Sequence, residues 1–256
     1  MSISLINNGE KLGEFKTFWE EEIKKIQEQE VFEVRPGETY ESHLMGGQFQ
    51  FCVKLKSYLV FHIRGLQEVL GYENKEFDLD FIFFSDLIHP DHKFHFFSFY
   101  KTIFKIHMIP QFTGYENISF SFKVMLKHKD GRYLKFFAQS VATMVAEDGG
   151  YAGGFFNLMN VDGMADSYNF GWDISGEKEV VKAFKGRMKK EMSSLLTKRE
   201  SDVLRYLKDG YSSKMIAQEL GIAKNTVDNY RSQMLKKTST GNTAQLISMA
   251  QKNGWI

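Results

Sequence analysis

Side chains that could recognise a nucleic acid are concentrated between Lys224 and Lys237. Amides and hydroxyls can bond base edges in a groove of DNA, whereas Lys and Arg contact phosphates. At helical spacing, the apolar residues of this segment form one stripe and the polar residues form the opposite face. The stripe consists of Val227, Tyr230, Met234 and Leu235. Together with one preceding lysine, the candidate contact residues are Lys214, Lys224, Asn225, Thr226, Asp228, Asn229, Arg231, Ser232, Gln233, Lys236 and Lys237.

Four predicted helices would position these side chains. Thr197 and Glu200 have the spacing of a capping box, in which each side chain caps the other residue's backbone N–H, so a first helix begins there. A second helix ends at Gly221, and the third follows within a few residues, which is the short connection of a helix-turn-helix. A last helix is predicted over Thr243–Asn253. Residues 195–256 are therefore predicted to form an all-α, four-helix domain.

The charged residues are distributed unevenly along the chain. Residues 177–256 hold 16 of the 33 Lys and Arg residues but only 8 of the 32 Asp and Glu residues. A basic tail on an acidic body is typical of a protein whose one end meets a polyanion, although a solvated basic helix would give the same counts. Double-stranded DNA is the polyanion that fits a helix-turn-helix.

Several ordered motifs in this region resemble the helix-turn-helix domain of LuxR-type regulators. They are Leu196–Leu204, Ile216–Ile222, Asn225–Val227 and Met234–Lys237. The resemblance implies that the third helix reads the major groove and that the last helix serves dimerisation. It implies base contacts by Asp228, Asn229 and Ser232. It also implies contacts to the DNA backbone by Lys214, Lys224, Thr226, Lys236 and Lys237.

Four positions depart from the usual pattern of that family. Ala223 stands where a Ser or Thr cap is common, Met215 where Glu is common, and Tyr230 where His is common. Asp228 replaces a frequently basic residue, and an acid near DNA repels phosphates unless it accepts a hydrogen bond from a cytosine amine. These departures leave open a second hypothesis, a protein-interaction or scaffold module whose degenerate helix-turn-helix no longer binds DNA.

The preceding part of the chain is predicted to contain one antiparallel sheet with helices. Glu10–Val31 has the three-to-four spacing of an amphipathic helix. Five strands are predicted, two of them within Gln48–Arg64 and the others over Ile118–Leu126, Tyr133–Ala146 and Tyr151–Asn160. Between the second and third strands come a short helical section after Gly71 and a helix over Asp91–Ile106. The predicted fold class is therefore α+β, a five-stranded sheet followed by the helical domain.

This order of elements resembles a PAS domain over residues 48–165. The motifs that carry the resemblance are Val69–Tyr72, Leu87–Asp91, Lys127–Tyr133 and Asn160–Asp162. The resemblance implies a curved sheet that cradles helices, often around a small-molecule cavity. Residues 1–47 are then an N-terminal helix and connection. Residues 166–194 are a linker helix with an apolar stripe of Val180, Phe184, Met188 and Met192.

The sequence predicts no resident cofactor and no metal. Cys52, the single cysteine, stands outside the Asn-Cys-Arg motif of flavin photosensors and cannot supply a cysteine-rich zinc module. A haem-binding sensor stays an alternative, with possible axial ligands among His89, His92, His95 and His107. The phenylalanines are expected to fill the core, and an unidentified apolar ligand or a dimerisation role is left open. They include Phe81, Phe83, Phe84, Phe96, Phe97, Phe136 and Phe137.

No pattern in the sequence points to an enzyme. There is no phosphate-cradling glycine loop and no Ser/His/Asp arrangement, and Gly149-Gly150 and Gly153-Gly154 are interpreted as turns beside a strand. The acidic pocket of a phosphorylated receiver domain is absent. The lack of a long apolar stretch or secretory start, together with a lone thiol, predicts a cytoplasmic protein without a membrane partner. The combined hypothesis is a homodimeric one-component transcription regulator that binds roughly palindromic DNA half-sites.

Overall fold

The computed structural model describes residues 3–33, 44–57, 59–77, 86–106, 118–149, 151–164, 170–193, 195–238, 240–252 and 256. Backbone contacts divide the chain into a sheet unit, Leu5–Phe184, and a helical unit that contains Lys185–Ile256. The expected core residues Phe81, Phe83 and Phe84 and the candidate haem ligand His107 lie outside the described residues. Over the described ranges, no helix combines the length and apolar character needed to cross a membrane.

Seven strands of the described residues form the sheet, and all of their pairings are antiparallel. Six of them lie in the order β3-β2-β6-β5-β4-β7, and β1 pairs with the end of β5. In β4, buried residues alternate with more exposed ones, because successive side chains point to opposite faces of a sheet. The bounds are β1 Val31–Glu33, β2 Gln48–Lys54, β3 Leu59–Arg64, β4 Ser119–Lys127, β5 Tyr133–Ala146, β6 Tyr151–Asn160 and β7 Gly171–Ser175.

The five predicted strands are present, but the sheet is larger than the sequence predicted. The additional strands are β1, paired with β5, and β7, paired with β4. β7 lies within residues 166–194, which the sequence assigned to a linker. Strands of three and five residues carry too little periodicity to be recognised before their pairing partner is known.

The glycine pair of β6 is not a turn, so its interpretation from the sequence is wrong. Gly153 and Gly154 lie inside the strand, opposite Lys54 and Val53 of β2. A Cβ atom on Gly153 would lie 2.4 Å from the carbonyl oxygen of Val53, so the two strands approach closely only because a side chain is missing. Gly149, by contrast, adopts φ 81° in the turn after β5, as expected.

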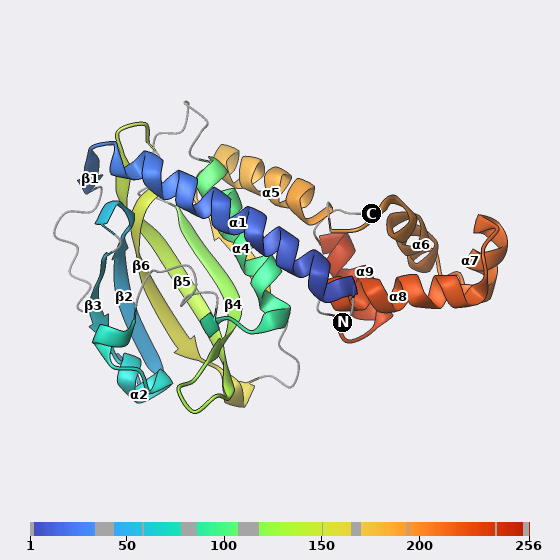
Figure 1. Cartoon of the computed structure of the whole chain (residues 1–256), viewed down its shortest axis with the longest axis horizontal. Helices are drawn as coiled ribbons and strands as arrows, with labels where there is room; N and C mark the ends of the chain where they lie inside the picture. The colour runs from blue at the N-terminus through green and yellow to red at the C-terminus, as the bar shows by residue number, and fades with distance from the viewer. Residues whose placement is uncertain are drawn as a thin grey trace. The chain divides into compact units, whose positions relative to one another are not determined.

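Two long helices, α1 (Ile3–Gln27) and α4 (Pro90–Ile106), lie across one face of the sheet (Figure 1). The rings of Phe15 and Phe97 are 4.5 Å apart between centroids, and the rings of Trp19 and Phe104 are 5.5 Å apart. These contacts join α1 to α4. Helix α1 begins before the predicted Glu10 and ends at Gln27, not Val31.

The aromatic core confirms part of the expected set of phenylalanines. Phe96, Phe97 and Phe136 are buried, whereas Phe137 is only half-buried because it alternates with Phe136 along β5. The short helix α2 (Leu66–Leu70), which ends at Gly71, was not predicted, and the short helical section expected after Gly71 falls partly on residues 78–85, outside the described residues. Among the described residues after that glycine, Asn74–Glu76 form the 3₁₀ turn η2 and residues 86–87 are helical. Two further 3₁₀ turns are η1, Leu55–Ser57, and η4, Asp162–Met164.

The predicted linker helix is α5, Lys178–Ser193, and its first half packs within the sheet unit. Phe184 is fully buried, and its ring lies 5.3 to 5.6 Å from those of Phe99, Phe120 and Trp172. Phe184, one member of the predicted apolar stripe, therefore anchors the first half of α5 on α4, β4 and β7.

The helical unit contains the four predicted helices of the C-terminal domain, α6 Lys198–Lys208, α7 Ser213–Leu220, α8 Lys224–Thr238 and α9 Thr243–Lys252. The capping box at Thr197 is confirmed, and Ser212 caps α7. Gly221 ends α7 in the left-handed conformation at φ 62°. The fully buried core residues of these helices are Val203, Leu204, Ile216, Val227, Met234, Leu246 and Ala250.

Candidate nucleic-acid interface

One side of α8 is a continuous polar surface, which we call the recognition face. Val227 and Met234 are fully buried on the opposite side and fix the rotation of the helix. This orientation follows from the apolar stripe in the sequence, although Tyr230 and Leu235 are only half-buried. The exposed members of the recognition face are Lys224, Asn225, Asn229, Ser232, Gln233 and Lys236.

Asp228 flanks the recognition face and is ion-paired within its own helix. Its carboxylate lies 2.7 Å from Nζ of Lys224, one helical turn earlier. Hydrogen bonds from Lys224 and from the Ser213 hydroxyl hold the pKa of the Asp228 carboxyl below its usual range. The sequence predicted both residues as contacts but did not predict that they pair.

Arg231 is bonded inside the helical unit. Its guanidinium donates to Oγ of Ser213 at 2.7 Å and to Oγ1 of Thr243 at 2.9 Å. These bonds tie α8 to the first residues of both α7 and α9. Spacing along one helix could not reveal them, because the acceptors lie 18 and 12 residues away in the chain.

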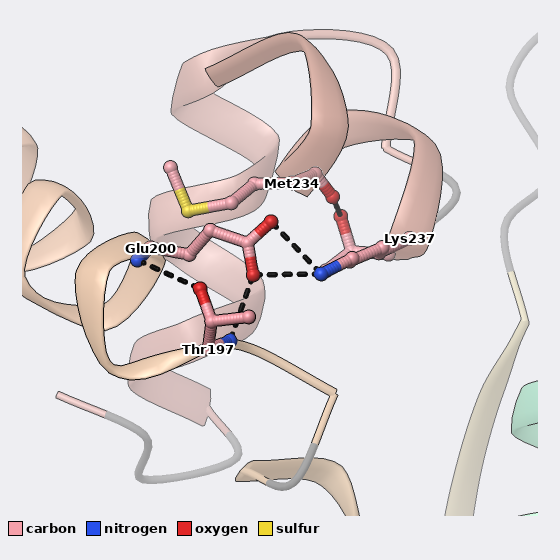
Figure 2. A network of polar contacts seen from close by, with 5 residues as sticks. Thr197, Glu200, Met234 and Lys237 are labelled. Carbon is pink, nitrogen blue, oxygen red and sulfur yellow. Dashed lines mark hydrogen bonds and ion pairs between the residues drawn. The ribbon is translucent and has the colours of Figure 1, made fainter. Parts of the chain in front are cut away.

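Lys237 forms a second internal contact. Its Nζ lies 2.7 and 2.8 Å from the two carboxylate oxygens of Glu200, a side chain that is fully buried (Figure 2). The same carboxylate accepts from the Thr197 backbone N–H at 2.7 Å, and Thr197 Oγ1 accepts from the Glu200 N–H. Glu200 therefore caps α6 and also anchors α8, a role that the capping-box spacing did not reveal.

The remaining candidates are placed at the starts of the two helices. Lys214 is exposed near the beginning of α7, and Thr226 is half-buried in the first turn of α8. The backbone carbonyl of Ala223 accepts from the N–H groups of Thr226 and Val227, so α8 begins where the sequence predicted it.

The sheet unit contains a small apolar cavity between α1, α4 and the strands β2 and β6. Its volume is about 20 Å³, and its lining includes Trp19, Phe51, Tyr100 and Phe156. This is room for about one water molecule, whereas pockets for drug-sized ligands measure roughly 300–1,000 Å³. Within the described residues, the buried Nε1 of Trp19 has no hydrogen-bond partner.

His92 on α4 and His89 in the turn before it accept backbone hydrogen bonds, whereas His95 is buried and its ring stacks on that of Phe170, with 6.0 Å between the centroids. Nδ1 of His92 accepts from the Met125 backbone N–H, and Nδ1 of His89 accepts from the Asp91 N–H. A neutral imidazole that accepts at Nδ1 carries its proton on Nε2, so neither nitrogen keeps a free lone pair for iron. Among the described residues, no group of three or more His, Cys, Asp or Glu side chains is arranged to hold a metal ion. Burial raises the pKa of the Cys52 thiol to about 11, which suppresses the reactive thiolate.

Comparison with known proteins defines the class of the C-terminal domain. Residues 194–250 match the family model described as bacterial regulatory proteins, luxR family. The helical unit thus contains a luxR-family helix-turn-helix domain, in agreement with the resemblance of its motifs.

Two curated relatives share this part of the chain. The transcriptional regulatory protein DegU of Brevibacillus brevis is 40% identical over 62 residues, which are 24% of this chain and 26% of that protein. DesR of Bacillus subtilis is 43% identical over 61 residues, or 24% of this chain and 31% of that protein. The chain thus matches less than a third of either relative, and the likeness is one of domains.

Solved structures with a longer alignment are much more distant. A structure of the Vibrio cholerae VqmA dimer is 19% identical, with 81% of this chain and 83% of that chain covered and a TM-score of 0.30. Escherichia coli SdiA is 14% identical, with 82% and 84% covered and a TM-score of 0.25. At these scores the two likenesses support no statement about the sheet unit.

Proposed function

We propose that this protein is a transcription regulator that binds double-stranded DNA by placing α8 in the major groove. The observation that carries the proposal is the recognition face: a row of amides, hydroxyls and lysines on one exposed side of a luxR-family helix-turn-helix. Asn225, Asn229, Ser232 and Gln233 are suited to base edges, which they can bond as donors and acceptors.

The phosphate contacts in this proposal come from the exposed cations beside that face. Lys214, Lys224 and Lys236 are exposed, and Thr226 adds a hydroxyl. The ammonium of Lys224 also pairs with Asp228, so its phosphate contact would be shared with that pair. Arg231 and Lys237 act differently, because their head groups are already bonded to Ser213 and Thr243 and to Glu200. They support DNA binding by fixing the helices.

The direct test is the salt dependence of DNA binding by the full-length chain. Sequences selected from a random duplex library serve as the probe, and fluorescence anisotropy gives the affinity. Lys214→Ala is expected to lower the affinity for all DNA sequences alike and to lower the slope of log affinity against log salt by about one. Asn229→Ala is expected to relax the preference at one base position. Binding no stronger than background at low salt contradicts the proposal.

The rival hypothesis is that the helix-turn-helix has become a protein-interaction module. It rested partly on the presence of an acidic residue, Asp228, in α8. Lys224 neutralises that charge locally, at 2.7 Å from Asp228, so repulsion of phosphates is weakened. The acidic residue is therefore no longer an argument for the rival.

The sheet unit is proposed as a PAS-like input domain that senses a small molecule or holds two copies of the chain together. Two features support this. The helices α2 and α4 lie between the second and third of the five expected strands, and the unpartnered Nε1 of Trp19 lies beside an apolar cavity. A buried donor without a partner costs about 1–3 kcal/mol, which a bound hydrogen-bond acceptor would remove. Because the cavity measures only about 20 Å³, a ligand larger than a water molecule would have to widen it. Native mass spectrometry of the purified chain tests whether such a molecule is carried.

A further inference from the structure

A chain of hydrogen bonds runs from α9 to the edge of the recognition face. Thr243 and Ser213 both accept from the guanidinium of Arg231, at 2.9 and 2.7 Å. Arginine can only donate, so the single hydroxyl proton of Ser213 is left for another acceptor. The Asp228 carboxylate, which binds Lys224 at 2.7 Å, lies near enough that hydrogen bonding by Ser213 also lowers the pKa of that carboxyl.

Two partners therefore hold the Asp228 carboxylate from different elements. Ser213 lies at the start of α7 and is buried, whereas Lys224 lies at the start of α8 and is exposed. The Asp228 side chain itself is still 41% exposed. A carboxylate has about four acceptor positions, so this one retains capacity for an external donor after both internal bonds are made.

We propose that Asp228 specifies a cytosine by accepting a hydrogen bond from its 4-amino group in the major groove. This inference rests on the proposed function, in which α8 lies in that groove. The only base-edge donors in the major groove are the amino groups of cytosine and adenine. Adenine presents its N7 acceptor beside the amine, which repels a carboxylate, and guanine and thymine present acceptors at the corresponding places.

The hydrogen-bonded chain explains how an acid can serve on a DNA-facing helix. Lys224 offsets its charge against the phosphates, and Ser213 fixes the direction of the carboxylate. Arg231 is then a positioning residue, since it acts on the base through Ser213. By fixing Ser213, the guanidinium of Arg231 would limit the positions that the Asp228 carboxylate can take, and a less mobile carboxylate discriminates better between bases.

The experiment compares base preferences of full-length variants on the same random duplex library. The wild type is expected to select one cytosine in each half-site, with roughly tenfold discrimination at that position. Asp228→Asn is expected to shift that preference toward adenine, because an amide can pair with N6 and N7 together. Asp228→Ala is expected to remove the preference.

Two matched variants separate a positioning effect from loss of structure. Ser213→Ala is expected to reduce discrimination at the cytosine position by a larger factor than it reduces the affinity for non-specific DNA, and hydrogen exchange of α8 measures how far the loss of the Arg231–Ser213 bond loosens the helix itself. Asn229→Ala, on the neighbouring part of the recognition face, is expected to change the base preference at a different position of the DNA site. The preference for cytosine at the first position is expected to stay. If the wild type binds specific DNA but Asp228→Asn selects the same base at every position, the inference is overturned and the proposed function stands. If the wild type binds no DNA, both are overturned.

Discussion

Lysines of similar sequence context have different surroundings on α8. Lys236 is exposed on the recognition face, whereas the adjacent Lys237 is only 26% exposed and pairs with the fully buried Glu200. The two residues differ by one position, which turns the side chain by about 100° around a helix. A buried carboxylate depends on its partner, because removing the partner leaves an uncompensated charge away from water.

Lys237→Met is therefore expected to destabilise the helical unit by about 3 kcal/mol, and Lys236→Met by less than about 0.5 kcal/mol. Hydrogen exchange of peptides from α6 and α8 in the full-length chain measures both changes. In DNA binding, Lys236→Met is expected to have the larger effect. It lowers the slope of log affinity against log salt by about one, whereas Lys237→Met leaves this slope unchanged once the affinity is corrected for the folded fraction. Equal loss of protection in the two variants contradicts this assignment.

At the scale of elements, the close approach of β2 and β6 depends on a missing side chain. A Cβ atom on Gly153 would lie 2.4 Å from the Val53 carbonyl oxygen and 3.1 Å from Sδ of Met144. A Cβ atom on Gly171 in β7 would meet no atom nearer than Lys123 Cδ, at 3.9 Å. The two glycines thus provide a matched pair within one sheet.

Gly153→Ala is expected to lower the free energy of unfolding of the sheet unit by about 1–3 kcal/mol, because the strands must separate to admit the methyl group. Gly171→Ala should change it by less than about 0.5 kcal/mol. Urea unfolding followed by tryptophan fluorescence gives both values. A tolerated Gly153→Ala would show that β2 and β6 can move apart without cost.

At the scale of the whole molecule, the proposed regulator acts as a two-fold dimer on DNA. The helix-turn-helix of each copy then reads one half-site, and the two half-sites lie about one helical turn, or 10 base pairs, apart. Insertion of 5 base pairs between them is expected to weaken binding at least tenfold, because it places the half-sites on opposite sides of the duplex. Insertion of 10 base pairs should restore part of the affinity. Sedimentation of the complexes reports the number of chains bound, and equal affinity for all three spacings contradicts a dimeric reader.

How much of the fold the sequence predicts depends on the range of the interactions involved. The helices α6 to α9 were predicted because caps, helix-ending glycines and apolar periodicity act over a few residues. The strands β4, β5 and β6 were predicted because alternation and turn residues are also local. The strands β1 and β7 were missed, because such short segments become strands only by pairing with β5 and β4.

The same division applies to the candidate interface. The sequence by itself determined the helix-turn-helix and the polar side of α8, since both follow from side-chain type at helical spacing. Only the tertiary structure decided which cations are engaged internally, because Glu200 is 37 residues from Lys237 and Ser213 is 18 residues from Arg231. No periodicity encodes contacts across such distances, and packing of the buried faces of α6, α7 and α9 against α8 brings these partners together.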